Sequence, residues 1–337
     1  MTALPLASML EIPSLALDAE PPAAEKPWQQ KVRRVGQLNF TEHDAVALNV
    51  EEWADYYKSI HADAVFISIT GIIAYYPTNV PFHHRSKFLG DRDLFGECVA
   101  AARKRNIHVV GRMSPDLNFE DALQAHPEWS MRDKEGNALH SAEDPRLFRT
   151  CMFSTYMTDY MPAVMREVNA KYEVDCLYTN GWPPLGNLPV CYCSVCKNLP
   201  PPGTPAYWEK FNERVFYLWK LYDGIAKEKK PTSFFFANLG GGVHGGPNLA
   251  ELGAFAGAAA EESHFVIADE RVNRPQTLAE GKFNLLFGFA TSKPGAFDTW
   301  LVTQRAGASR VRPVSVNRSA TSKNRVEWEI ETAILRN

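Results

Sequence analysis

The sequence predicts an α/β protein of the TIM type, a (β/α)8 barrel that is irregular or incomplete at its carboxyl-terminal end. Short apolar segments alternate with amphipathic ones, and polar or glycine-rich residues follow each short segment. No glycine-rich dinucleotide fingerprint follows the first of them, which favours a barrel over an open doubly wound sheet. The segments expected to be barrel strands are residues 35–40, 63–70, 107–112, 174–178, 233–239 and 264–268.

Helices are expected between these strands because apolar residues recur there at helical spacing. Asn49 is the expected N-cap of the first helix, and Asp91 and Asp93 open the next one, which runs to Arg105. The remaining predicted helices are residues 156–172 and 207–229.

The carboxyl-terminal part of the sequence has a weaker barrel pattern. Residues 283–289 fit either a strand or a helix, 310–316 fit a strand, and 326–335 have helical spacing. With one further strand expected after Asp269, the barrel would be open, and its unpaired edges would favour a homo-oligomer. Residues 118–149 are expected to form an insertion above the barrel.

The composition is that of a folded protein with a full hydrophobic core. Of the 337 residues, 45% are hydrophobic and 22% are charged, and the formal net charge is -3. The basic residues are scattered, which argues against nucleic acid as the main partner. No apolar run approaches the ~18 residues of a membrane span. A small neutral or polar substrate therefore suits this chain better.

The sequence divides into a leader, residues 1–33, and a barrel domain, residues 34–337. The leader is first rich in apolar and small residues and then in prolines, without a periodic pattern. It fits a disordered segment, or the remnant of an export signal that lacks its basic front end. The second alternative predicts a periplasmic or extracellular protein, and the first a cytoplasmic one. Six cysteines in a chain of this length fit either compartment.

Three thiols lie close together in the segment after the fourth expected strand. They belong to Cys191, Cys193 and Cys196, and Cys151 is the natural fourth ligand of a closed metal site. This spacing suits zinc or another thiolate-bound metal, and a disulfide or reduced thiols are the alternatives. We expect the cluster to be structural and to hold the loop that follows this strand.

Carboxylates follow the expected strands at the ends where a parallel barrel builds its site. They are Glu42 and Asp44 after the first strand, Asp116 after the third, and Asp269 and Glu270 after the sixth. The alternative role for each of them is to cap a helix or to pair with an arginine at the barrel rim.

Several motifs, in this order and at these intervals, resemble the hypothetical glycosyl hydrolase family numbered six. They span residues 34–274 and read RVGQLNFTEHDA, AYYPTNVPFHHRS, GDRDLFGECVAAARKRNIHVVGRMSPD, HPEW, TCMFSTY, YTNGW and CYCSVC. The resemblance implies a (β/α) barrel related to alpha-L-fucosidases and other retaining hydrolases, with a carbohydrate-related role. Asn180 departs from that pattern, because it stands where the fucosidase-like enzymes carry an aspartate nucleophile and an amide cannot attack.

Together with the strand-exit carboxylates, the resemblance predicts a glycoside hydrolase, which ordinarily needs two carboxyl groups around the scissile bond. Asp269 is the predicted nucleophile or base, and Glu42 or Asp116 is the predicted acid. The residues predicted to bind the saccharide are Asn180, Trp182, Tyr75, His84, Arg112, Asn238, Glu270 and Arg271. A turn, packing or surface role is the structural alternative for each of them.

Three classes of function follow. The first is hydrolysis of O-glycosidic bonds, with no cofactor required for catalysis and a structural zinc suggested by the cysteines. The second is a non-catalytic carbohydrate-binding barrel that has lost a carboxylate, which Asn180 would explain. The third, a metal or redox protein built on the cysteine cluster, has no second redox motif to support it.

Overall fold

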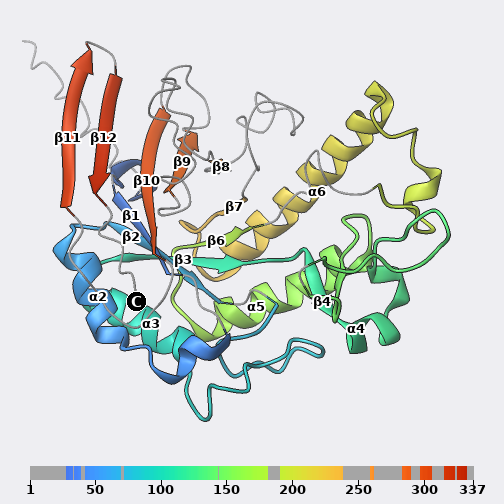
Figure 1. Ribbon diagram of the computed structural model, residues 1–337, viewed down its shortest axis with the longest axis horizontal. Coiled ribbons are helices and arrows are strands. Elements are labelled where there is room, and N and C mark those ends of the chain that lie inside the picture. The colour runs from blue at the N-terminus through green and yellow to red at the C-terminus, as the bar shows by residue number, and fades with distance from the viewer. Residues whose placement is uncertain are drawn as a thin grey trace, which may run out of the picture.

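In a computed structural model, the protein is described over residues 28–32, 34–38, 42–69, 72–142, 144–180 and 190–237, and over the strands at 259–261, 283–289, 297–305, 315–322 and 325–331. The chain folds around one mostly parallel sheet with helices packed against it (Figure 1). The strands are β1 Arg34–Leu38, β2 Ala64–Ser68, β3 His108–Met113, β4 Leu117–Phe119, β5 Leu147–Arg149, β6 Cys176–Thr179, β7 Phe235–Ala237, β8 Ala259–Glu261, β9 Phe283–Phe289, β10 Phe297–Arg305, β11 Ser315–Ser322 and β12 Arg325–Glu331. The helices are α1 Trp28–Lys31, α2 Val50–Ser59, α3 Leu94–Lys104, α4 Glu120–Ala125, α5 Met161–Lys171 and α6 Pro205–Lys229, with short helical turns η1 Glu42–Val46, η2 Pro127–Trp129, η3 Tyr156–Tyr160 and η4 Cys196–Asn198.

The first half of the sheet is wound in chain order. Strands β1, β2, β3, β6 and β7 lie next to one another and run parallel. Helix α2 connects β1 to β2, α3 connects β2 to β3, α5 precedes β6, and α6 connects β6 to β7. A parallel sheet with a helix in each crossover is the arrangement from which (β/α) barrels are built.

The second half of the sheet departs from a regular barrel. Strand β10 pairs with β1 in parallel, β9 lies antiparallel to β10, and β8 lies antiparallel to β9. Strands β7 and β8, which end the sheet on its two sides, approach within 8 Å at their Cα atoms. The predicted fold class is therefore confirmed as an α/β fold with a parallel sheet, while the described residues form no closed barrel.

Aromatic side chains fill the inner face of the parallel strands, which is the face turned away from α2. Phe66 on β2, Tyr178 on β6 and Phe236 on β7 pack with ring centroids 4.9 to 5.8 Å apart. The opposite face packs closely on the helices. A Cβ atom at Gly36 on β1 would lie 2.3 Å from the ring of Tyr57 on α2, so only glycine allows this approach.

Side-chain caps fix the beginnings of α2 and α3 where the sequence predicted them. The side-chain oxygen of Asn49 accepts a hydrogen bond from the backbone nitrogen of Glu52 at 3.2 Å. Asp93 accepts one from the backbone nitrogen of Gly96 at 2.9 Å. Each cap satisfies an amide that the helix itself leaves without a partner.

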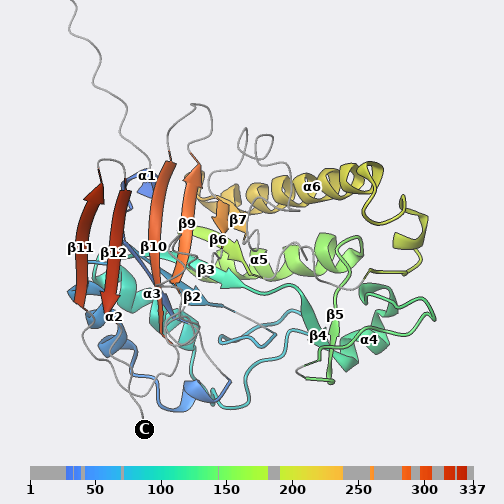
Figure 2. The ribbon, with the colours of Figure 1, turned by 45° about the horizontal axis from the view of Figure 1, so that its top comes forward.

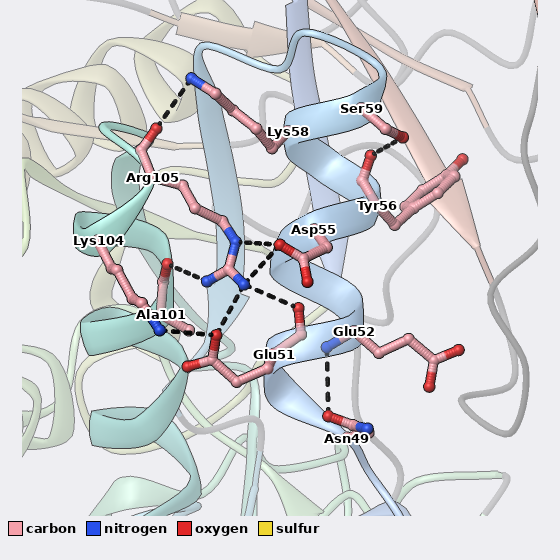
Figure 3. Close-up of polar contacts among 10 residues, drawn as sticks. All are labelled: Asn49, Glu51, Glu52, Asp55, Tyr56, Lys58, Ser59, Ala101, Lys104 and Arg105. Carbon is pink, nitrogen blue, oxygen red and sulfur yellow. Dashed lines mark hydrogen bonds and ion pairs between the residues drawn. The ribbon is translucent and has the colours of Figure 1, made fainter.

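Arg105, directly after α3, joins this helix to α2 (Figure 3). Its guanidinium donates to the carboxylates of Glu51 and Asp55 on α2, at 2.7 Å in each case. It also donates to the carbonyl of Ala101 at 3.0 Å. Hydrogen bonding from Arg105 holds the pKa of Glu51 below its usual value. One arginine thus fixes the angle between two neighbouring crossover helices.

A buried carboxylate ties together the amino ends of β3 and β6. Asp175 is 1% exposed and accepts a hydrogen bond from the backbone nitrogen of Val109 at 2.8 Å. It pairs with Arg103 at 2.8 Å, Lys230 at 2.6 Å and Nδ1 of His108 at 3.3 Å. Burial opposes its ionisation, but the close contact with His108 and the hydrogen bond from Lys230 hold the pKa of Asp175 well below its usual value.

Most predicted elements are confirmed in the described part of the chain. The first five predicted strands correspond to β1, β2, β3, β6 and β7, and the predicted strand 264–268 lies outside the described residues. Residues 118–149 form an insertion that contains α4 and most of the two-stranded sheet of β4 and β5 (Figure 2). Residues 283–289, which fitted a strand or a helix, form β9.

The prediction of helical structure at residues 326–335 is wrong. Strand β12 covers this segment up to Glu331 and pairs antiparallel with β11. Val326, Trp328 and Ile330 alternate with acidic residues, and this period of two is the pattern of a strand. The expectation of one further strand after Asp269 is wrong as well, because β9, β10, β11 and β12 follow it. The strand predicted at 310–316 overlaps only the start of β11.

Residues 1–27 of the predicted leader lie outside the described residues, and α1 lies within its last part. The division at residues 33 and 34 stays a prediction. Among the helices in the described ranges, none is both long enough and apolar enough to cross a membrane.

Candidate active site and cysteine cluster

The carboxyl ends of the parallel strands place three polar side chains side by side. Ser68 on β2 is in register with Arg112 on β3, which is in register with Tyr178 on β6. Partners in register on parallel strands point to the same face, and the ring of Tyr178 lies on the inner face of the sheet. Ser68 and Arg112 therefore face inward as well, at the end of the sheet where such folds bind ligands.

Tyr75, in the connection between β2 and α3, brings residues from three strand exits together. Its side chain is buried, and burial is the main reason why the pKa of its hydroxyl lies far above the usual value. The charges of Asp44 and Glu42 raise that pKa further, and the charge of Arg112 lowers it. Two carboxylates and one guanidinium are therefore near enough to act on the tyrosine hydroxyl, as expected for polar groups at the same end of a parallel sheet.

Glu42 is held in place by the same connection. The turn η1 carries Glu42 just beyond β1, and its backbone carbonyl accepts a hydrogen bond from Oγ of Ser86 at 3.1 Å. Its carboxylate accepts a second one from the backbone nitrogen of Lys87 at 3.3 Å. The β1 exit is thereby attached to the β2 exit, which restricts where the Glu42 carboxylate can lie.

Asp116 and Asn180 follow the neighbouring strands β3 and β6. The backbone carbonyl of Asp116 accepts a hydrogen bond from the backbone nitrogen of Thr150 at 3.0 Å, which links it to the insertion. The backbone nitrogen of Asn180 donates to the carbonyl of Met113 at 2.7 Å, and its side-chain oxygen accepts from the hydroxyl of Tyr178 at 3.5 Å. Both side chains thus belong to the same end of the sheet as Arg112.

Arg112 contributes a cation to this end of the sheet, and it forms no ion pair with a carboxylate among the described residues. Its Nε atom is buried and unpaired within the described ranges. His84 lies elsewhere, where its Nε2 pairs with Asp121 on α4 at 3.0 Å and both side chains are more than two-fifths exposed. The predicted site residues outside the described residues are Trp182, Asn238, Asp269, Glu270 and Arg271.

The four cysteines predicted as ligands come together in the fold. Their sulfur atoms all lie within 4.8 Å of one another. The Sγ of Cys151 is 3.8 Å from that of Cys191, 3.7 Å from that of Cys193 and 3.5 Å from that of Cys196. Four thiolates that hold zinc in a tetrahedron at ~2.3 Å have sulfur atoms roughly 3.8 Å apart, so the observed arrangement fits this metal.

The surroundings of the cysteine cluster suit negatively charged thiolates. The backbone nitrogen of Cys196 donates to the sulfur of Cys193 at 3.5 Å. Arg214, on α6, donates to the carbonyl of Met152 at 3.0 Å, directly beside Cys151. Burial lowers the pKa of Arg214, and the nearby thiols of Cys151 and Cys196 act in the opposite direction. A positive charge and an amide donor are the partners that a thiolate metal site needs outside its ligands.

Comparison with known proteins supports the resemblance noted in the sequence. Residues 49–181 match the family model described as Hypothetical glycosyl hydrolase 6. The predicted resemblance is thus confirmed over this region, which is less than half of the 337-residue chain. The matched region of this hypothetical glycosyl hydrolase family contains Tyr75, Arg112, Asp116 and Asn180, and it ends one residue beyond Asn180.

Solved glycosidase structures are similar at low sequence identity. An alpha-L-fucosidase, isoenzyme 2 from Paenibacillus thiaminolyticus, is 20% identical with a TM-score of 0.49, over 60% of this chain and 32% of that one. A polyextremophilic beta-galactosidase from the Antarctic haloarchaeon Halorubrum lacusprofundi is 17% identical with a TM-score of 0.49, over 73% and 43%. This chain spans less than half the length of both proteins. Comparison with curated proteins yields no match.

Sequence reasoning missed two residues that share the inner face with Arg112. Ser68 lies within an apolar segment of the sequence, and Tyr178 ends the apolar run that precedes Asn180, so neither stands out as a polar site residue. The period of two along β2 and β6 places both on the inner face, but that inference needs the register between strands. The register comes from packing and not from any local signal in the sequence.

Proposed function

We propose that this chain is a glycoside hydrolase that cleaves O-glycosidic bonds of a saccharide at the carboxyl ends of its parallel strands. The observation that carries the proposal is that parallel strands β1, β2 and β3 place Glu42, Asp44 and Arg112 at one end of the sheet, where their charges act on Tyr75. The match of residues 49–181 to a hypothetical glycosyl hydrolase family supports it, because the β2 and β3 exits with Tyr75 and Arg112 lie in that region, whereas Glu42 and Asp44 precede it.

The mechanism divides the work between two carboxyl groups. Glu42 or Asp116 donates a proton to the glycosidic oxygen, so that the leaving group departs as an alcohol. Asp269 acts as the ionised nucleophile or base, and the water that completes hydrolysis supplies a hydroxyl to the sugar and a proton to the enzyme. Asn180 holds a sugar hydroxyl, and Arg112 stabilises the carboxylate that stays ionised.

The remaining residues of the proposed saccharide site have supporting roles. Trp182 offers a ring face to the sugar, and Asn238, Glu270 and Arg271 bind its hydroxyls from the later strands. Tyr75 is buried, so it would contact the sugar only after a rearrangement that exposes its ring. His84 would take part only through a rearrangement of its surface pair with Asp121. Catalysis requires no cofactor in this scheme.

The alternative is a carbohydrate-binding barrel without catalysis. Asn180 favours it, because an amide stands where the resemblance places the nucleophile. Its backbone nitrogen donates to Met113, and its side-chain oxygen accepts from Tyr178. A panel of aryl glycosides, with release of the aryl alcohol as the signal, separates the two functions when glycan binding is measured calorimetrically in parallel. Turnover supports the hydrolase, and saturable binding without turnover supports the alternative.

Asp269→Asn tests the assignment of the nucleophile or base. We expect turnover to fall by about 10³-fold or more while saccharide binding persists, because the carboxylate acts in the chemical step. Asp133→Asn is the matched control, since Asp133 lies in a surface turn, where its carboxylate accepts a hydrogen bond from the backbone nitrogen of Asn137. Unchanged turnover in Asp269→Asn removes this residue from the mechanism.

We also propose that Cys151, Cys191, Cys193 and Cys196 hold one structural zinc ion. Four ligands leave no open position for substrate, so the site serves the fold and not the reaction. Elemental analysis of the purified chain should give one zinc per chain, and Cys191→Ser should reduce it strongly. Cys98→Ser, at a buried cysteine on α3 away from the cluster, should keep the metal. A metal-free wild type that keeps its melting temperature contradicts the proposal.

A further inference from the structure

A small cavity lies beside the carboxyl end of β3, between the β2–α3 connection and the π-helical turn η3. Its volume is about 10 Å³, and its lining includes His83, Ser114, Leu117, Asn118 and Tyr156. This is room for about one water molecule. His83 and Asn118 are only 6% and 2% exposed.

His83 presents an unprotonated nitrogen to this cavity. Its Nδ1 lies 3.1 Å from Oγ1 of Thr78 and 3.5 Å from the hydroxyl of Tyr76. Both hydroxyls already donate their protons to the carboxylate of Glu167, at 2.7 and 2.9 Å. Nδ1 must therefore be the donor in its contact with Thr78, which leaves Nε2 as an acceptor. Burial lowers the pKa of His83 to about 4, so the ring is neutral near pH 7.

Asn118 presents the complementary group. Its side-chain oxygen accepts a hydrogen bond from the backbone nitrogen of Phe119 at 2.7 Å, which fixes the orientation of the amide. The Nδ2 atom is then left as a buried donor that lies close enough to the hydroxyls of Tyr156 and Tyr160 to lower their pKa, but it makes no hydrogen bond of regular geometry. Nε2 of His83 makes none either. A buried acceptor and a buried donor on the wall of one cavity are both costly unless a third group satisfies them.

We propose that one water molecule occupies this cavity, donating a hydrogen bond to Nε2 of His83 and accepting one from Nδ2 of Asn118. A hydroxyl group has the same donor and acceptor character, but a sugar that carried it would not fit in the space. The water joins the connection after β2 to strand β4, which directly follows the segment that carries Asp116.

This bridge makes His83 a positioning residue for the segment that carries Asp116. That consequence rests on the proposed function, whereas the water site does not. The test therefore uses no glycoside turnover, so its failure and a failure of the proposed function are distinguishable.

Two measurements on the full chain test the site directly. Long-range ¹H–¹⁵N spectra of histidine-labelled protein should show His83 as the neutral Nδ1–H tautomer near pH 7, with the resonance assigned by its loss in His83→Gln. A high-resolution crystal structure should show an ordered water within about 2.7–3.2 Å of both Nε2 and Nδ2. An empty cavity, or a proton on Nε2 at that pH, overturns the proposal.

A variant in which Asn118 is replaced by a side chain of equal size provides a second test of the water bridge. Asn118→Asp replaces the donor by a carboxylate, and through the bridging water this charge should raise the pKa of His83 above that of the wild type. Asn198→Asp adds the same charge at an exposed position and should leave the His83 spectrum unchanged. A wild-type His83 titration in Asn118→Asp overturns the bridge, and the two wild-type measurements decide the question if this variant does not fold.

Discussion

The environment of Asp175 predicts a measurable loss of stability when this residue is replaced. Its buried carboxylate faces Arg103, Lys230 and His108. Asp175→Asn should lower the free energy of unfolding by about 2 kcal/mol, because the buried side chain then loses its charge-assisted hydrogen bonds with partly exposed cations. Urea denaturation measures the change, and Asp144→Asn, at an exposed ion pair, should leave the midpoint almost unchanged. A change well below this value would mean that water replaces Asp175 as the hydrogen-bond partner of Arg103 and Lys230.

The same carboxylate gives a pH dependence of known sign. The pKa of Asp175 is lower in the folded chain than the ~3.9 of an unfolded one, so its contribution to stability is fully present above that value. The contribution is lost as the pH falls through the folded pKa. Denaturation midpoints at pH 7 and pH 3 should therefore differ more in the wild type than in Asp175→Asn. An equal difference in both proteins would contradict the assignment.

Single residues also mark how far the sequence alone could lead. Asn49 and Asp93 could be predicted as caps because capping is a local property of a few residues. The place of Glu42 and Asp116 at strand exits follows from the alternation of elements. The separation between their carboxylates could not be predicted, because it depends on the sheet register and on hydrogen bonds such as that from Lys87 to Glu42.

At the scale of the element, helix α2 depends on its cap. Asn49→Ala should lower the free energy of unfolding by about 1 kcal/mol, because the backbone nitrogen of Glu52 then loses its acceptor. Asn49→Asp keeps an acceptor oxygen and serves as the matched variant. Chemical denaturation of the three proteins provides the measurement. Equal losses in both variants would mean that the asparagine acts through its amide nitrogen and not as a cap.

The cysteine cluster should control the stability of the segment around η4. Removal of the metal by a chelator, or Cys191→Ser, should increase proteolytic cleavage between residues 190 and 204 and lower the melting temperature. The reason is that this segment has few buried side chains, with Cys193 the exception before α6. Cys176→Ala, at a buried cysteine of β6, should leave the cleavage pattern in this segment unchanged. Unaltered cleavage after metal loss would contradict the structural role.

Elements differed in how well the sequence predicted them. Helices α2, α3, α5 and α6 could be predicted because their apolar stripes are long and periodic. Strand β12 could not, because a short apolar pattern fits either period until its partner β11 is known. The antiparallel pairing of β8, β9 and β10 could not be predicted either, because it depends on contacts between strands and not on the residues within one strand.

For the whole molecule, the parallel half of the sheet is what gives the strand exits a common end. The five strands in chain order bring Glu42, Tyr75, Arg112, Asp116 and Asn180 to that end, although they are spread over more than a hundred residues of sequence. Association into a homo-oligomer stays a prediction, and light scattering of the purified chain measures it. Function depends on the chemistry of this end and not on the fold class by itself.

The most direct test of the central claim is the leaving-group dependence of hydrolysis in Glu42→Gln and Asp116→Asn. With a phenyl glycoside, the variant that lacks the acid should lose about 10²–10⁴-fold in kcat, because its leaving group needs a proton. With a dinitrophenyl glycoside, which departs without protonation, the same variant should retain most of the wild-type rate of bond cleavage. Equal losses with both substrates in both variants, or no turnover by a folded wild type that binds saccharide, would contradict a glycoside hydrolase with its acid at these strand exits.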